Sequence, residues 1–139
     1  MIWMDINGGT ALERQKLEGA FWFALSELMP RKENLDVEIT ISDLGDDACG
    51  YWSGEKGDTH FIDIQKGQES SDLVTALFHE MVHVRQCERN VPMDSTLPYY
   101  ERPYEVEAYK LQEELWNRYS KKAIPLTRQS IKKDTMTIC

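Results

Sequence analysis

Two histidines and a glutamate stand at a spacing that suits metal-dependent hydrolysis. His79, Glu80 and His83 form the pattern His-Glu-x-x-His near the middle of the chain. On a helix of 3.6 residues per turn, His79 and His83 lie on one face, where both imidazoles can bind the same ion. Zinc accepts imidazole and carboxylate ligands, and a catalytic zinc lowers the pKa of a bound water to about 7. Glu80 is close enough to that water to act as general base.

The residues around this pattern predict a buried helix. Between Leu73 and Val84 almost every side chain outside the pattern is apolar. A helix that is apolar nearly all round lies inside a protein. Buried histidine and glutamate side chains are costly unless they are paired or bind a metal. The competing interpretation is a packed helix that carries two histidines by chance, and the apolar setting makes it the weaker one.

A third protein ligand is needed, and the last predicted helix, from about Tyr104 to Lys121, offers Glu105 and Glu107. These carboxylates point about 160° apart on a helix, so at most one of them faces the ion. The apolar and aromatic side chains of this helix gather around the direction of Glu105, whereas Glu107 falls outside that arc. We therefore expect Glu105 to be the ligand, with Glu107 as the alternative.

Other side chains near the pattern could bind the metal or the substrate. Cys87 lies one turn beyond His83 and could be a ligand, but a small core residue is the preferred interpretation. His60 could be a ligand or a hydrogen-bond donor, and a surface histidine is the preferred interpretation there. Hydrolysis also needs a donor for the developing oxyanion. Four tyrosines close to Glu105 in the sequence could supply it: Tyr99, Tyr100, Tyr104 and Tyr109.

The elements predicted before the pattern are one helix and three strands. Thr10 and Glu13 form a capping box that opens a helix, and Pro30 ends it. Residues 1–9 end in the turn signal Asn-Gly-Gly. Alternating apolar residues predict a strand over 35–42, followed by strands over 48–53 and 59–65 that are joined by a hairpin loop.

The helix with the pattern follows these strands. Ser70 or Ser71 can cap it, Asp72 is favourably placed near its positive end, and it runs to about Arg89. A loop rich in proline and tyrosine, residues 92–103, then leads to the last helix. This order of elements predicts an α+β fold.

The composition fits one soluble globular domain. A chain of 139 residues can bury a real core. It contains no run of 18 or more apolar residues, so we expect no membrane span. The first residues lack a basic region followed by a long apolar run, so we expect no secretory signal. Three widely spaced cysteines are not a disulfide framework and favour a reducing, cytoplasmic compartment.

The charge is unevenly placed along the chain. The formal net charge is -8, with -13 on residues 1–116 and +5 on residues 117–139. We place one domain at residues 1–120 and a basic tail at residues 121–139. The tail could touch nucleic acid. A solvated tail that balances an acidic body is the preferred interpretation, because phosphate repels such a body.

A resemblance to a known family rests on two segments. The residues 79–86 (His-Glu-Met-Val-His-Val-Arg-Gln) and 102–108 (Arg-Pro-Tyr-Glu-Val-Glu-Ala) resemble the small gluzincin metallopeptidases of phages and bacteria, and are similar to SprT-like and ImmA/IrrE-type zinc proteases. The gluzincin third ligand is a glutamate within Glu-x-x-Ala, which Glu105 to Ala108 matches. The Asp or Asn that often follows the alanine is Tyr109 here. SprT proteins use a third histidine, and none follows His83.

The resemblance implies both a fold and an activity. The fold is zincin-like, with an N-terminal helix, a small three-stranded twisted sheet, the active-site helix and a C-terminal helix that carries the third ligand. An edge strand lies above the metal and pairs with extended substrate, and residues 59–65 are our candidate for it. We expect a zinc-dependent metallopeptidase acting on a protein or peptide, with His79, His83 and Glu105 as ligands and Glu80 as general base. The alternative is a non-catalytic binding or adaptor module that zinc stabilises.

Overall fold

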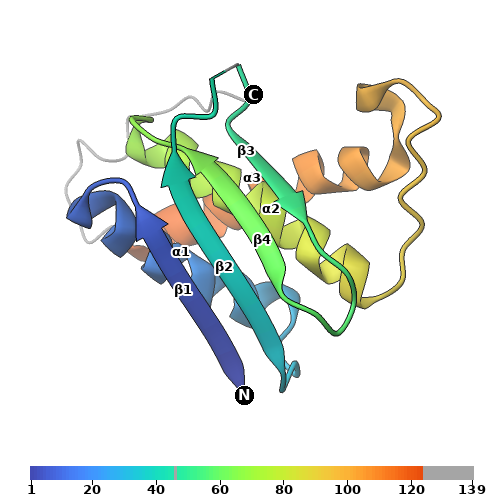
Figure 1. Ribbon diagram of the computed structural model, residues 1–139, viewed down its shortest axis with the longest axis horizontal. Helices are drawn as coiled ribbons and strands as arrows, with labels where there is room; N and C mark the ends of the chain where they lie inside the picture. The colour runs from blue at the N-terminus through green and yellow to red at the C-terminus, as the bar shows by residue number, and fades with distance from the viewer. Residues whose placement is uncertain (46, 124–139) are drawn as a thin grey trace.

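The computed structural model describes residues 1–45 and 47–123 as an α+β arrangement of three helices and a four-stranded sheet (Figure 1). The strands are β1 (Ile2–Gly8), β2 (Leu35–Ser42), β3 (Gly50–Ser53) and β4 (His60–Gln65). The helices are α1 (Ala11–Leu28), α2 (Ser70–Glu88) and α3 (Pro103–Ala123), with the short 3-10 helix η1 (Tyr99–Glu101) before α3. None of the helices in these ranges is long and apolar enough to cross a membrane.

The prediction of a three-stranded sheet is wrong, because residues 2–8 form a fourth strand, β1. This strand pairs with β2 in parallel, from Ile2 beside Leu35 to Gly8 beside Ile41. A parallel neighbour requires a crossover connection, and α1 supplies it. Ile2, Met4 and Ile6 do alternate with polar or exposed residues, but the apolar Trp3 between them obscures that pattern.

The strand order is β1-β2-β4-β3, which places β4 inside the sheet and β3 at its edge. β4 pairs in parallel with β2 on one side and antiparallel with β3 on the other. The prediction that residues 59–65 form the edge strand is therefore wrong. The loop over residues 54–59 returns the chain beside β2, so the short preceding strand β3 takes the edge that lies over α2 (Figure 1).

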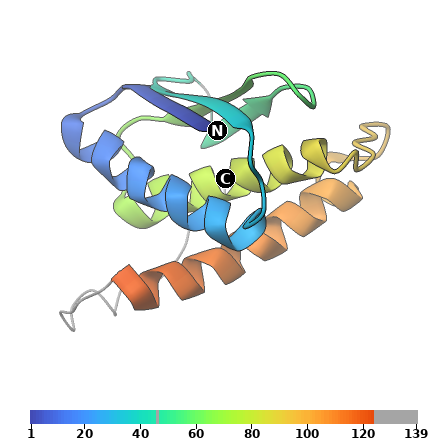
Figure 2. The ribbon, with the colours of Figure 1, turned by 90° about the horizontal axis from the view of Figure 1, so that it is seen from below.

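All three helices cover the same face of the sheet (Figure 2). The inward side chains of β2 and β4, among them Val37, Ile39 and Ile62, form the core with α1 and α2. α2 is buried along its length from Leu73 to Val84, as its apolar sequence predicts. α3 packs mainly against α2 and therefore approaches the side of α2 that carries the histidines.

The helix ends are partly as predicted. The capping box of α1 is confirmed, because the Thr10 hydroxyl accepts from the Glu13 amide at 3.0 Å and the Glu13 carboxylate accepts from the Thr10 amide at 2.9 Å. The predicted serine cap of α2 is wrong. Its N-cap is Glu69, and the Ser70 hydroxyl accepts from Lys16 Nζ at 2.5 Å. At the other end of the chain, α3 includes residues 121–123 of the predicted basic tail, and residues 124–139 lie outside the described residues.

Candidate metal centre

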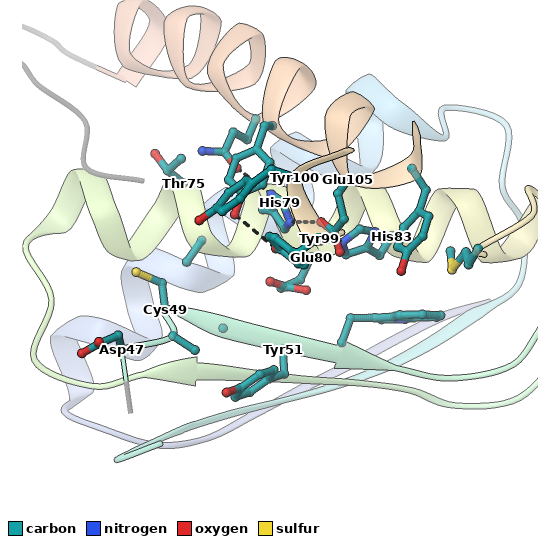
Figure 3. Close-up of a pocket in the computed structure, with 18 of the residues that line it drawn as sticks. Asp47, Cys49, Tyr51, Thr75, His79, Glu80, His83, Tyr99, Tyr100 and Glu105 are labelled. Carbon is teal, nitrogen blue, oxygen red and sulfur yellow. Dashed lines mark hydrogen bonds and ion pairs between the residues drawn. The ribbon is translucent and has the colours of Figure 1, made fainter. Parts of the chain in front are cut away.

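The two helices α2 and α3 bring His79, His83 and Glu105 together (Figure 3). The Nε2 atoms of His79 and His83 lie 3.0 Å and 3.2 Å from the same oxygen, Glu105 Oε1. One ligand atom from each residue falls within 4.8 Å of the others, and all three side chains are buried. These are the three residues that the sequence predicted as metal ligands.

Two glutamines hold the outer nitrogens of the imidazoles. Gln112 Oε1 on α3 lies 2.7 Å from His79 Nδ1, and Gln86 Oε1 on α2 lies 2.7 Å from His83 Nδ1. The Gln86 amide nitrogen donates to the Tyr104 carbonyl at 2.9 Å, which sets the direction of its amide oxygen. An amide oxygen only accepts, so Nδ1–H donates to it and Nε2 is left for a metal.

This arrangement fits a cation. A neutral imidazole that donates through Nδ1 presents the Nε2 lone pair to a carboxylate oxygen, and two such contacts need positive charge between the groups. Burial alone would lower the pKa of His83, but Glu105 and Glu80 outweigh it and raise that pKa. Burial alone would raise the pKa of Glu105, but hydrogen bonds from His79 and His83 hold it at about 2. A divalent ion bound by the imidazoles and the carboxylate would supply this positive charge, and neither imidazole would have to be protonated at Nε2.

Glu80 lies beside this cluster and is not one of its three residues. Its side chain is buried, lines the same cavity, and extends from α2 towards Gly50 of β3. Burial raises the pKa of Glu80. β3 approaches α2 closely at Gly50, where an added Cβ would make tight contacts, 3.0 Å from the Asp63 carbonyl oxygen and 3.3 Å from Glu80 Oε2.

A cavity of about 660 Å³ opens onto the cluster between α2, β3 and the segment before α3. All four tyrosines that the sequence offered as oxyanion donors line it: Tyr99, Tyr100, Tyr104 and Tyr109. The hydroxyls of Tyr99 and Tyr109 lie 3.1 Å apart. Burial raises the pKa of both, so each stays protonated at neutral pH and keeps a proton to donate.

His60 is not the surface histidine that the sequence favoured. It is fully buried on the inner face of β4, where its Nε2 lies 2.8 Å from Glu88 Oε2. Its Nδ1 accepts from the Trp52 indole at 3.1 Å, and Glu88 also bonds Lys32 at 2.6 Å. His60 and the free, half-buried thiol of Cys87 both fall outside the three-residue cluster found in the described part of the chain.

Gln112 was not among the residues that the sequence predicted for the site. It follows Glu105 by seven residues, two helical turns, and therefore shares the face of α3 that meets the histidines. That spacing was the available signal. Glu107, the alternative ligand, instead accepts from Gln86 Nε2 at 2.7 Å and lies 3.8 Å from Arg85. Glu107 thus holds Gln86, the partner of His83, and does not itself face the imidazoles.

Comparisons with protein-family models, curated proteins and solved structures found no match to this chain. The likeness to gluzincin peptidases is therefore a likeness of residue pattern. The site itself combines a cluster of three candidate metal ligands, a separate buried carboxylate and an adjoining cavity.

Proposed function

We propose that this protein is a zinc-dependent metallopeptidase with a zincin-like arrangement of its sheet and helices. The observation that carries the proposal is the convergence of His79 Nε2 and His83 Nε2 on one oxygen of Glu105. A buried carboxylate, Glu80, lies beside them in the same cavity. Two imidazoles and one carboxylate are a known ligand set of catalytic zinc.

Different residues would have different roles in peptide hydrolysis. A zinc ion held by His79, His83 and Glu105 would supply Lewis acidity to a water and to the scissile carbonyl. Glu80 accepts a proton from the attacking water and returns it to the leaving amine, a role that its raised pKa suits. The phenol groups of Tyr99 and Tyr109 are the candidate donors to the developing oxyanion.

β3 is the strand that we propose pairs with an extended peptide substrate. β3 is the edge strand next to the cavity, and Gly50, Tyr51 and Trp52 all line it. An extended peptide that pairs with the open edge of β3 would run beside this strand, along the cavity that Glu80 and the candidate metal ligands line. β3 therefore replaces residues 59–65 as the proposed substrate-binding edge.

The non-catalytic alternative requires a closed site. A structural zinc has four protein ligands, whereas a catalytic zinc keeps a position for water. Within the described residues the cluster contains three ligands, and Cys87 is not among them. The three-ligand cluster and its adjoining cavity favour the enzyme over a zinc-stabilised adaptor.

The test combines metal content with hydrolysis of an unbiased peptide mixture by the full-length protein. Wild type and Glu80→Gln should each hold about one zinc per chain. Glu80→Gln should lose roughly 10²- to 10⁴-fold in hydrolysis, because the general base is removed. Glu113→Gln, on the exposed side of α3, is the matched control and should keep full activity. A folded wild type that takes up no added zinc, or a fully active Glu80→Gln, would overturn the proposal.

A further inference from the structure

A chain of hydrogen bonds leads from Lys32 to the wall of the cavity. Lys32 Nζ donates to Glu88 Oε1 at 2.6 Å. Glu88 Oε2, at the end of α2, lies 2.8 Å from His60 Nε2 on β4. His60 Nδ1 accepts from the Trp52 indole on β3 at 3.1 Å. Trp52 lines the cavity, so this chain of hydrogen bonds ends beside the candidate metal centre.

The partners of His60 determine which of its ring nitrogens carries the proton. An indole N–H can only donate, so His60 Nδ1 carries no proton and Nε2–H donates to Glu88. The planes of the imidazole and the Trp52 indole lie 28° apart, which suits this bond because the Nδ1 lone pair lies in the plane of its ring. His60 is fully buried, and both of its nitrogens have partners. The imidazole is therefore held in place and can hold the indole in turn.

Gly54 leaves the space in which this contact forms. It follows β3 directly, and a Cβ at this position would lie 2.6 Å from His60 Nδ1. Non-bonded carbon and nitrogen atoms repel each other strongly at that distance, well below the optimum of about 3.5 Å. A larger residue at position 54 would therefore displace the His60 ring from the indole of Trp52.

The indole ring of Trp52 lies beside a candidate metal ligand. Its centroid is 6.0 Å from that of the His83 ring, and the two planes lie 40° apart. Because the indole N–H donates to His60, Trp52 presents the cavity with an aromatic ring that has no free donor. A peptide paired with β3 would place a side chain against this ring, since neighbouring strands bring side chains of the same face together. An apolar or aromatic side chain suits such a wall.

We propose that His60 is a positioning residue, which fixes the Trp52 indole beside His83 as the wall against which an apolar side chain of the bound peptide packs. Glu88 holds His60 in the orientation that this role needs. The proposal rests on the proposed peptidase function, since it concerns how the same site holds its peptide. The bond between His60 and Glu88 also joins β4 to the end of α2, which by itself would stabilise the fold without affecting peptide choice. The experiment therefore has to measure peptide preference and not stability.

The probe is a set of fluorescent, end-capped alanine octapeptides in which one phenylalanine or one glutamine is moved along the peptide. Binding is measured by fluorescence anisotropy with zinc-loaded, full-length Glu80→Gln, which binds without cleaving. At the best position the phenylalanine peptide should bind about tenfold more tightly than the glutamine peptide. His60→Leu in this background should lower that ratio roughly threefold to tenfold, as expected for one lost hydrogen bond. His60→Asn, whose Oδ1 can accept from the indole, should keep most of the preference.

Further variants separate positioning from stability. In the Trp52→Phe background, His60→Leu should have little further effect on the ratio, because it has no indole to hold. Gly54→Ala displaces the same imidazole without removing a buried polar group, so it should also lower the ratio and shift the NMR resonance of the Trp52 indole N–H. Ile6→Val, on β1 at the opposite edge of the sheet, reduces core packing and is the control that should leave the ratio and the resonance unchanged.

The outcomes distinguish this inference from the proposed function. Equal binding of the phenylalanine and glutamine peptides, or a ratio that is unchanged in both His60→Leu and Gly54→Ala, would overturn the inference. Independent, additive effects of His60→Leu and Trp52→Phe would overturn it as well. Hydrolysis by wild type is a separate readout: coupled effects of these two variants on binding without any cleavage would refute the peptidase and leave a peptide-binding site with the same wall.

Discussion

Gln86 and Glu107 are joined across α2 and α3 by a hydrogen bond of 2.7 Å from Gln86 Nε2 to Glu107 Oε1. The same amide accepts from His83 through its oxygen. Glu107 therefore influences the site indirectly, because it holds the glutamine that orients His83, a candidate metal ligand. The two glutamates of the first turns of α3 thus have different tasks, since Glu105 faces both imidazoles directly.

The first prediction separates these two carboxylates. Glu105→Ala should abolish stoichiometric zinc binding, because it removes a ligand. Glu107→Ala should still bind about one zinc per chain, since it removes only a partner of Gln86. Metal analysis of the two purified variants beside wild type measures this directly. Zinc lost from Glu107→Ala and retained by Glu105→Ala would reverse the assignment.

The second prediction concerns the amide that orients His83. Gln86→Met keeps the length of the side chain but cannot accept from Nδ1–H, and zinc affinity should fall about 10- to 100-fold. Competition with a chromophoric chelator measures the affinity. Gln15→Met, at an exposed position of α1, is the matched control and should bind as wild type does. Equal affinities in both variants would show that the imidazole needs no such partner.

The third prediction concerns the space between β3 and Glu80, the proposed general base. Gly50→Ala places a methyl group 3.3 Å from Glu80 Oε2 and 3.0 Å from the Asp63 carbonyl. Displacement of Glu80 or of the substrate strand should lower kcat/KM roughly 10- to 100-fold while zinc content stays at about one per chain. Gly19→Ala on α1 adds the same methyl group away from the cavity and should keep activity. Wild-type kcat/KM in Gly50→Ala would contradict the close approach of β3.

The fourth prediction is a pH dependence of stability outside the metal site. Burial alone would raise the pKa of Glu88, but hydrogen bonds from Lys32 and His60 outweigh it and lower that pKa. A lowered carboxylate pKa stabilises the fold above the ordinary value of 4.5, and this contribution is lost as the pH falls through the folded-state pKa. Glu88→Gln should therefore reduce the free energy of unfolding by about 1 to 2 kcal/mol at pH 7.

Urea unfolding at several pH values provides the measurement for Glu88. The difference between wild type and Glu88→Gln should shrink steadily below pH 4.5 and vanish once Glu88 is protonated in the folded protein. Glu33→Gln, an exposed residue with the same change of charge, should show little difference at any pH. A Glu88→Gln effect that is independent of pH would mean that packing, and not the ion pair, carries the contribution.

Local periodicity explains which parts of the site were predictable. The spacing of His79 and His83 determines that both lie on one helix face, and the apolar arc of the last helix pointed to Glu105. The burial of α2 followed from its apolar sequence, and the α1 capping box from Thr10 and Glu13. Each of these inferences depends on residues within a few turns of one another, where helix geometry is nearly constant.

The tertiary structure alone decided how distant segments meet. That residues 2–8 form a strand, and that β3 and not β4 lies at the edge, depends on pairing with β2, which no local pattern specifies. Tertiary packing also decides three further contacts between distant segments. It pairs His60 with Glu88 and Gln112 with His79, and it brings Asp47 and Asp72 to the same cavity. The sequence by itself thus determined which side chains could hold a metal and on which helix faces they lie. The structure decided their partners and the cavity walls, because these contacts join residues far apart in the chain whose proximity depends on how the sheet and helices pack.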